Sequence, residues 1–387
     1  MVAHVALTPA PFTIQVEDAT LEDLRRRLRQ ARLPAQVPGI GWEQGTELGF
    51  LRRFLTYWAD GFDWRREEAR LNAFQHFRAD VDGVAIHFVH ERARDGKGIP
   101  LILTHRWPSA FAELLPLVPL LTDPARHGIA GPSFDLVLPS LPGYGFSGRP
   151  AHANYRTVAG MWHRLMQRLG YDRYAAGGGD FGAGVSSYMA LDAPDRILGL
   201  HLTTPELSPP LEGGSPPLTE AEARYLEDVG RWDAVERGYS AIQSTRPQTL
   251  GYALNASPAG LAAWILEKWR TWSDSGGDLL AHVSPDFLCT LLTLYWATES
   301  ITTSMRDYHD NRWRGAPLRP GEVIRVPTAF ARFDRCFASE GSPPREWIER
   351  LYAVRRFTEM PRGGHFAAAE EPELLARDLA AFFAEIG

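Results

Sequence analysis

Short apolar runs, each ending in glycine, proline or polar residues, recur through the middle of the chain. Four of them are IPLILT, FDLVLP, YAAGG and ILGLHL, and VIRVPTAFARF follows much later. Segments with helical periodicity, notably YRTVAGMWHRLMQRLGY and AGVSSYMALDAP, separate them. Before the first run, FRADVDGVAIHFVHERA alternates apolar and polar residues around an Asp-Gly pair, as a β-hairpin does. This alternation of strands and helices predicts an α/β fold with a mostly parallel sheet.

Two helical regions accompany this α/β core. The first includes the amphipathic stretch DATLEDLRRRLRQARLP, for which Asp18 or Thr20 is the expected N-cap and Pro34 the expected stop. The second is tryptophan-rich, runs from about 219 to 314, and follows the proline- and glycine-rich stretch at 207–218. EPELLARDLAAFFAEI predicts a final helix. We therefore expect an N-terminal helical extension, a first part of the core, a helical cap and a second part of the core, at residues 1–78, 79–210, 211–320 and 321–387.

Composition excludes several classes of function. The net charge is -6, from 41 basic and 47 acidic residues, and no basic run offsets it, so we expect no nucleic-acid partner. The two cysteines, Cys289 and Cys336, are far apart and imply no disulfide framework. Neither a signal peptide nor an apolar run long enough to span a membrane is evident. These features predict a cytoplasmic protein without a membrane anchor, and we expect no metal or cofactor.

The stretch GGGDFGAG places an aspartate, Asp180, at a turn framed by glycines between an expected strand and an expected helix. The pattern Gly178-x-Asp180-x-Gly182 is typical of a nucleophile elbow, where a tight turn lifts the central side chain above the sheet. An aspartate there can attack carbon and form an ester. The alternative is an ordinary N-cap aspartate, since aspartate is favoured at that position.

Two further segments favour the catalytic interpretation. PRGGHFAAAEEPELL places His365 in a glycine-rich turn after the last expected strand, where a hydrolase of this type keeps its general base. THRWPS follows the first core strand, where an oxyanion loop is expected. Its donors would be the backbone N–H groups of Trp107 and Phe181.

At this point the chain resembles the α/β-hydrolase-fold epoxide hydrolases that carry an extra N-terminal region, the microsomal-type group. The matching segments are DWRREEARLNAFQHF, GGDFG, GYSAIQSTRPQTLGYAL, LLTLYWATESITTSMRDYH and EMPRGGHFAAAEEPELLARD. The resemblance implies that Asp180 is the nucleophile and that His365 activates water. It also implies that Tyr239 and Tyr308 of the cap hydrogen-bond the epoxide oxygen.

The chain departs from the family at two places. The loop is His-Arg-Trp-Pro-Ser, so Arg106 stands where the family has glycine, and we expect strain if that position requires positive φ. The family's triad acid falls on Cys336 when counted from the strand, and near Glu340 when counted back from PPREW. Asp334 and Glu206 are further candidates, and the loss of any acid is the alternative. We predict Glu340.

Three functions remain open from the sequence. The first is hydrolysis of an epoxide to a vicinal diol. The second is altered chemistry on the same scaffold, as in a haloalkane dehalogenase or an epoxide-opening cyclase; the paired tyrosines argue against the dehalogenase. The third is a catalytically impaired binding homologue. The expected partners are a small apolar or aromatic epoxide as substrate and water, and a homodimer is a further expectation. The tryptophan-rich cap favours a bulky apolar or aromatic group on the epoxide, although tryptophan at helical spacing is more often core packing.

Overall fold

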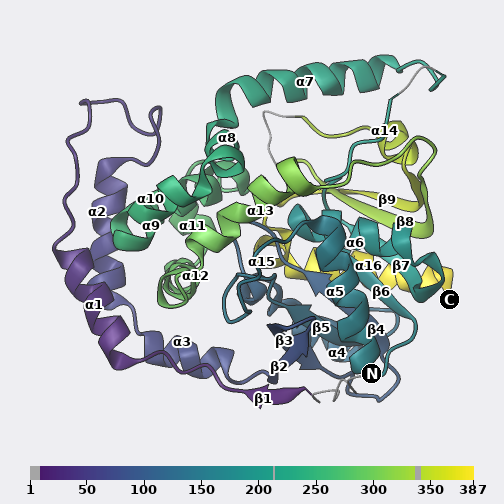
Figure 1. The fold of residues 1–387 in the computed structure, drawn as a ribbon, viewed down its shortest axis with the longest axis horizontal. Helices are drawn as coiled ribbons and strands as arrows, with labels where there is room; N and C mark the ends of the chain where they lie inside the picture. The colour runs from purple at the N-terminus through teal and green to yellow at the C-terminus, as the bar shows by residue number, and fades with distance from the viewer. Residues whose placement is uncertain (1–8, 212–213, 336–340) are drawn as a thin grey trace.

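A computed structural model describes residues 9–211, 214–335 and 341–387. One mixed sheet forms the centre, with helices on both sides of it and a helical layer above its upper edge (Figure 1). The strand order is β1-β2-β3-β5-β4-β6-β7-β8-β9. The strands are β1 (Ala10–Phe12), β2 (His76–Val81), β3 (Val84–Glu91), β4 (Ile99–Thr104), β5 (Phe134–Pro139), β6 (Tyr174–Gly178), β7 (Ile197–Leu202), β8 (Ile324–Phe333) and β9 (Tyr352–Met360).

The sheet is antiparallel at one edge and parallel through the rest. Strands β1, β2, β3 and β5 pair antiparallel in turn, while β5, β4, β6, β7, β8 and β9 run parallel. The β2–β3 turn uses Asp82 and Gly83, both at positive φ, as a two-residue hairpin requires. The predicted hairpin and core strands are confirmed, and β1 was missed because three residues carry no readable alternation.

The helices form three groups. The N-terminal group is α1 (Asp18–Arg29), α2 (Leu48–Thr56), the π-helical turn η1 (Tyr57–Gly61) and α3 (Trp64–Leu71). The core group is η2 (Phe111–Leu114), α4 (Leu117–Thr122), η3 (Pro124–His127), α5 (Tyr155–Arg168), α6 (Phe181–Asp192), η4 (Pro194–Arg196), α14 (Arg345–Glu349), α15 (Ala367–Glu370) and α16 (Pro372–Ile386). The cap group is α7 (Glu220–Glu236), α8 (Gly238–Thr245), α9 (Pro247–Ala256), α10 (Pro258–Trp272), α11 (Leu279–His282), α12 (Pro285–Ala297) and α13 (Ile301–Arg314).

The first helix begins and ends differently from the prediction. Its N-cap is Glu17, and Asp18 is already helical, so neither Asp18 nor Thr20 caps it. Asp18 instead pairs with Arg65 of α3, a contact between two helices that the local pattern does not encode. The helix ends at Arg29, before Pro34 can act as the stop. The boundary expected from capping preference is therefore wrong by one residue or more, because the side chain of Asp18 pairs with another helix and does not cap its own.

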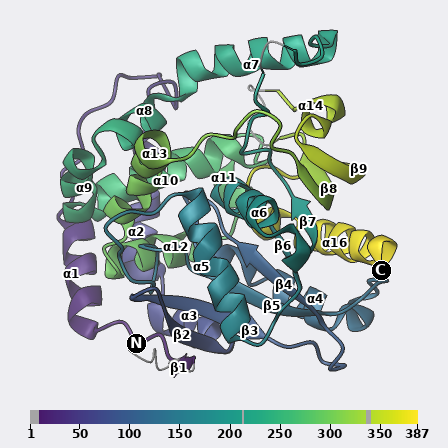
Figure 2. The same ribbon diagram turned by 45° about the vertical axis from the view of Figure 1, so that its right-hand side comes forward.

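The N-terminal helices hold the cap from one side. The indole N–H of Trp58 donates to Thr293 Oγ1 of α12 at 2.9 Å, and the hydroxyl of Thr46 donates to the Ala263 carbonyl of α10 at 2.7 Å. Figures 1 and 2 agree that α1 and α2 lie beside α10 and α12, while α7 extends across the top of the molecule. This packing gives the cap a fixed position over the sheet. The α/β-hydrolase fold with a cap and an N-terminal extension is thus confirmed, and the exact domain boundaries stay predictions.

No helix within the described ranges is long and apolar enough to cross a membrane.

Candidate active site

The turn between β6 and α6 places Asp180 above the carboxyl end of the sheet. Asp180 lies at φ 52° and ψ -126°, a strained conformation for a residue with a side chain. The glycines on either side are required by close approach. A Cβ on Gly178 would lie 2.5 Å from the Thr104 carbonyl oxygen, and one on Gly182 would lie 2.0 Å from it. The turn therefore has the geometry of a nucleophile elbow, with Asp180 also serving as the N-cap of α6.

The two carboxylate oxygens of Asp180 have different surroundings. The backbone N–H of Phe181 donates to Oδ1 at 2.6 Å, and that of Trp107 donates to the same oxygen at 3.3 Å. The other oxygen, Oδ2, lies 3.7 Å from Nε2 of His365. The two predicted oxyanion donors therefore converge on one oxygen and leave the other beside the histidine.

The charge state of Asp180 is governed by its enclosure. Burial raises the pKa of Asp180 well above its usual value, and the negative charge of Glu206 raises it further. The N–H groups of Phe181 and Trp107 and the guanidinium of Arg106 act in the opposite direction on this pKa. The ionised carboxylate is thus held at a higher energy than an exposed one, which favours its reaction with an electrophile.

His365 is fully buried in the turn between β9 and α15. Its backbone N–H donates to the Trp272 carbonyl at 2.7 Å, which ties the turn to the end of α10 in the cap. Burial lowers the pKa of His365 well below its usual value; the nearby Arg106 charge lowers it too, and a hydrogen bond with the Trp107 backbone raises it. At neutral pH the imidazole is therefore neutral, the form that can accept a proton.

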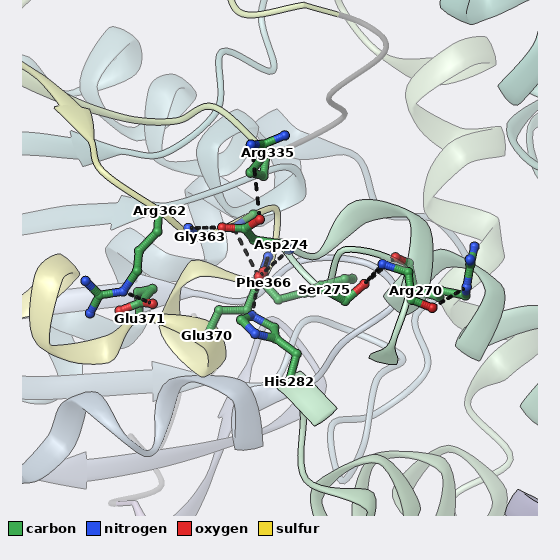
Figure 3. A network of polar contacts seen from close by, with 12 residues as sticks. Arg270, Asp274, Ser275, His282, Arg335, Arg362, Gly363, Phe366, Glu370 and Glu371 are labelled. Carbon is green, nitrogen blue, oxygen red and sulfur yellow. Dashed lines mark hydrogen bonds and ion pairs between the residues drawn. The ribbon is translucent and has the colours of Figure 1, made fainter. Parts of the chain in front are cut away.

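The carboxylates of Glu370 and Asp274, both labelled in Figure 3, hold the turn that carries His365. Glu370 accepts the N–H of Gly364 at 3.1 Å and that of Phe366 at 2.8 Å, on either side of His365. It also accepts the N–H of Asp274 at 2.7 Å. Asp274 in turn accepts the N–H of Gly363 at 3.0 Å. These bonds fix the backbone around the imidazole without touching its ring.

Arg106 forms a buried bridge behind the site. Its side chain is 4% exposed, and its Nε lies 3.1 Å from Oε1 of Glu113, which is fully buried. The guanidinium also donates to Thr203 Oγ1 at 3.1 Å and to the backbone carbonyl of His365. Arg106 is not among the described non-glycine residues with positive φ, so the conformational strain expected from replacing a glycine is absent. The arginine instead links the oxyanion loop to the histidine turn.

The two cap tyrosines face the elbow together. Tyr239 lies on α8 and Tyr308 on α13, with ring centroids 5.9 Å apart and the two rings edge to face. The indole of Trp107 stacks on Tyr239 at 5.4 Å, and Phe181 lies edge-on to Tyr308 at 4.9 Å. Burial and the charge of Asp180 raise the pKa of both phenols, so both keep their protons at neutral pH.

A cavity of about 590 Å³ joins these groups. Its wall includes Asp180, Phe181, Tyr239 and Tyr308. Other parts of its wall combine aromatic residues with charged and polar ones, among them Tyr155, Trp232, Phe330, Glu206, Arg237 and Arg312. The volume falls within the range of about 300–1,000 Å³ usual for small-molecule sites. Within the described ranges, no cluster of three or more histidine, cysteine or acidic side chains is arranged to hold a metal ion.

The candidate triad acids are only partly described. Cys336 and Glu340 lie outside the described residues, and the prediction of Glu340 stays a prediction. Asp334 contacts Arg332 at 2.8 Å and is half exposed. Glu206 accepts a hydrogen bond from the Tyr155 hydroxyl at 2.5 Å inside the cavity. Among the described residues, neither Asp334 nor Glu206 forms an ion pair with His365.

Several supporting residues were missed from the sequence. Glu113 is an acid inside the apolar run FAELLPLVPLL, a signal that could have marked a buried charge with a partner. Glu370 follows the histidine by five residues within FAAAEE, which gives no hint of its role. Asp274 reaches the turn from the cap across a large sequence distance. Such a contact requires the fold to be known first.

Comparison with known proteins agrees with this geometry. The family described as the epoxide hydrolase N terminus matches residues 9–114, and the alpha/beta hydrolase fold matches residues 99–239. Epoxide hydrolase 1 of Sus scrofa is 36% identical over 403 residues, covering 96% of this chain and 88% of that one.

Two solved structures are also similar over nearly their whole length. Epoxide hydrolase from Aspergillus niger is 30% identical with a TM-score of 0.86, covering 99% of this chain and 97% of that one. Juvenile hormone epoxide hydrolase from the silkworm Bombyx mori is 31% identical with a TM-score of 0.89, covering 100% of this chain and 96% of that one. The chain therefore belongs to the microsomal-type epoxide hydrolases of the α/β-hydrolase fold, and it is an enzyme of that class.

Proposed function

We propose that the chain hydrolyses an epoxide to a vicinal diol through a covalent ester on Asp180. The main support for the proposal is that the two carboxylate oxygens of Asp180 have different neighbours. Two backbone N–H groups hold Oδ1, while Oδ2 lies 3.7 Å from the imidazole of His365. One oxygen is thus fixed in place, and the other is available to attack.

In the first step, Oδ2 of Asp180 forms a bond to one epoxide carbon as the bond from that carbon to the ring oxygen breaks. The ring oxygen leaves as an alkoxide, which is strongly basic. Tyr239 and Tyr308 donate hydrogen bonds to it, and a proton passes from one of the two phenols to this oxygen as negative charge develops, which leaves that tyrosine as a phenolate. Two neutral phenols are suited to this because their protons are retained until charge appears.

In the second step, His365 removes a proton from water, and the resulting hydroxide attacks the ester carbonyl carbon of Asp180. Negative charge then develops on Oδ1, where the N–H groups of Phe181 and Trp107 already point. The bond from the acyl carbon to the former Oδ2 breaks, and the imidazolium of His365 gives its proton to that oxygen as the diol leaves. The new carboxylic acid of Asp180 loses its proton to the tyrosine that was deprotonated in the first step, which restores the starting state. Glu340 is proposed to hold the imidazole and stabilise its charged form.

The substrate is proposed to be a small apolar or aromatic epoxide. Aromatic side chains in the cavity wall, including Tyr155, Trp232 and Phe330, provide apolar contact beside the reacting groups. A volume of about 590 Å³ leaves room for an aryl substituent beyond the epoxide ring. The retained tyrosine pair favours an alkoxide leaving group over a halide.

A single turnover in ¹⁸O-labelled water tests the ester mechanism. With enzyme in excess over styrene oxide, the oxygen transferred to carbon comes from Asp180, so the first diol is unlabelled and ¹⁸O enters the Asp180 carboxylate. Direct attack of water on the epoxide would instead place ¹⁸O in the first diol. Asp180→Asn, with deamidation excluded by mass, should form no diol.

A further inference from the structure

Lysine is rare in this chain, and its placement is unusual. The sequence has two lysines, Lys97 and Lys268, and the remaining 39 of its 41 basic residues are arginine. Lys97 lies exposed in a turn before β4. Lys268 lies on α10 of the cap and is 7% exposed. A lysine is seldom buried unless it is paired, so its environment calls for an explanation.

The ammonium of Lys268 contacts the proposed active site through a ring. Its Nζ lies over Tyr239, 4.8 Å from the ring centroid, and 5.6 Å from the ring of Trp272. On the same Tyr239 ring the indole of Trp107 stacks at 5.4 Å with an interplanar angle of 7°. The phenol proposed to protonate the leaving oxygen is therefore in contact with both a cation and the indole of the oxyanion loop.

Two carboxylates keep the ammonium in this position. Nζ lies 2.6 Å from Oε2 of Glu267 and 3.8 Å from Oε2 of Glu236, which belong to α10 and α7. Burial raises the pKa of Glu236, and the positive charge of Lys268 opposes that rise. The ammonium is thus held between two acids on one side and two aromatic rings on another.

We propose that Lys268 is a positioning residue for ring opening, which fixes the Tyr239 ring and strengthens its phenol as a donor to the epoxide oxygen. The proposal rests on the proposed function, in which Tyr239 meets the developing alkoxide.

The physical reason lies in the change of charge during the reaction. As the proton of the phenol moves toward the alkoxide, electron density builds up on the oxygen and ring of Tyr239. A cation over the ring face is attracted more strongly to this electron-rich ring than to the neutral phenol. Lys268 therefore stabilises the transition state more than the ground state, which is the condition for a rate effect.

The second step should be insensitive to Lys268. Hydrolysis of the ester places negative charge on Oδ1 of Asp180, where the N–H groups of Phe181 and Trp107 lie. Tyr239 donates to the leaving oxygen in the first step and has no new charge to stabilise on the acyl carbon. Replacing Lys268 should therefore slow ester formation alone. A general weakening of the fold would slow both steps.

The test is a double-mutant cycle between Lys268→Met and Tyr239→Phe. Rapid-quench single turnovers with 4-nitrostyrene oxide and intact-protein mass spectrometry give the rates of ester formation and ester hydrolysis separately. Lys268→Met should slow ester formation about 3- to 30-fold, the range of a desolvated cation–π contact, and change ester hydrolysis less than about twofold. In the Tyr239→Phe background, the same substitution should change ester formation less than about twofold.

Lys97→Met is the matched control and should match the parent, and Lys268→Arg should restore most of the rate of ester formation. If Lys268→Met does not fold, Lys268→Gln, a neutral side chain that can still bond Glu267, takes its place in the cycle. The proposal would be overturned if Lys268→Met slowed ester formation equally with and without the Tyr239 hydroxyl. It would also be overturned if Lys268→Met slowed both ester formation and ester hydrolysis. A parental rate of ester formation in Tyr239→Phe would instead refute the donor role of Tyr239, and with it this inference.

Discussion

Replacing Arg106 should expose the energetic importance of its buried pair with Glu113. The two side chains are 4% and 0% exposed, and their charged atoms lie 3.1 Å apart. Arg106→Met leaves the Glu113 carboxylate buried without its cation, a change that costs about 3–5 kcal/mol in the free energy of unfolding. For a chain of this length this corresponds to a fall of roughly 4–6 °C in Tm.

The loss of stability caused by Arg106→Met should increase with pH. Burial already raises the pKa of Glu113, and Arg106 lowers it. When a carboxyl has a higher pKa in the folded than in the unfolded protein, the free energy of unfolding falls as pH rises. The fall begins near the unfolded pKa, about 4.3, and continues to the folded value. Without Arg106 the pKa of Glu113 in the folded protein rises further, so the free energy of unfolding keeps falling up to a higher pH. Arg106→Met should therefore be more destabilising at pH 8 than at pH 5.

Urea unfolding followed by near-ultraviolet circular dichroism measures these free energies. Arg106→Met and Glu113→Gln should be non-additive, with the double variant about 1–3 kcal/mol more stable than the sum of the single losses implies. The exposed pair Arg345–Glu349, with 2.7 Å between its atoms, is the control, and its coupling should be about 0.3–0.5 kcal/mol. Additive losses at Arg106 and Glu113, or a single loss under about 1 kcal/mol, would refute the reasoning.

Three further outcomes follow from the site. Tyr239→Phe and Tyr308→Phe should each slow ester formation about 10- to 1,000-fold and the double variant far more, measured by single-turnover quench; a parental rate in the double variant would exclude both as donors. Glu206→Gln removes a charge that helps raise the pKa of Asp180. The fall in the rate of ester formation on the acid side of its pH profile should therefore move to lower pH, and an unchanged profile would contradict this interaction. Glu340→Gln should slow ester hydrolysis more than ester formation, while Cys336→Ser should change little in the same pre-steady-state traces; the reverse ranking would assign the acid to another residue.

Local patterns were sufficient for much of the fold. The β-hairpin with Asp82 and Gly83 at its turn is encoded by residues that tolerate positive φ. The elbow is marked by its glycines two residues before and after Asp180, although the contact that requires them is with the Thr104 carbonyl of β4. Both signals lie in adjacent residues. The long apolar stretch near the end of the cap divides into α12 and α13 at Glu299, which has positive φ, and no local signal marks that break.

The supporting contacts could not be read from the sequence because they join distant segments. Arg106 was expected to strain its loop because the family has a glycine at this position. The sequence did not show which residue its guanidinium would pair with. Glu113 supplies that partner seven residues later, and the His365 carbonyl supplies another from the far end of the chain. Lys268 was unremarkable within AAWILEKWRTW until the fold placed it over Tyr239.

The proposed reaction passes through an ester on Asp180, whose hydrolysis depends on His365. The most direct test is the mass of His365→Gln after mixing with 4-nitrostyrene oxide, followed by peptide mapping. The variant should gain the mass of one epoxide, keep this adduct, and carry it on the peptide that contains Asp180. Diol formation at the parental rate without any adduct, or an adduct on a different residue, would exclude an Asp180 ester that His365 removes.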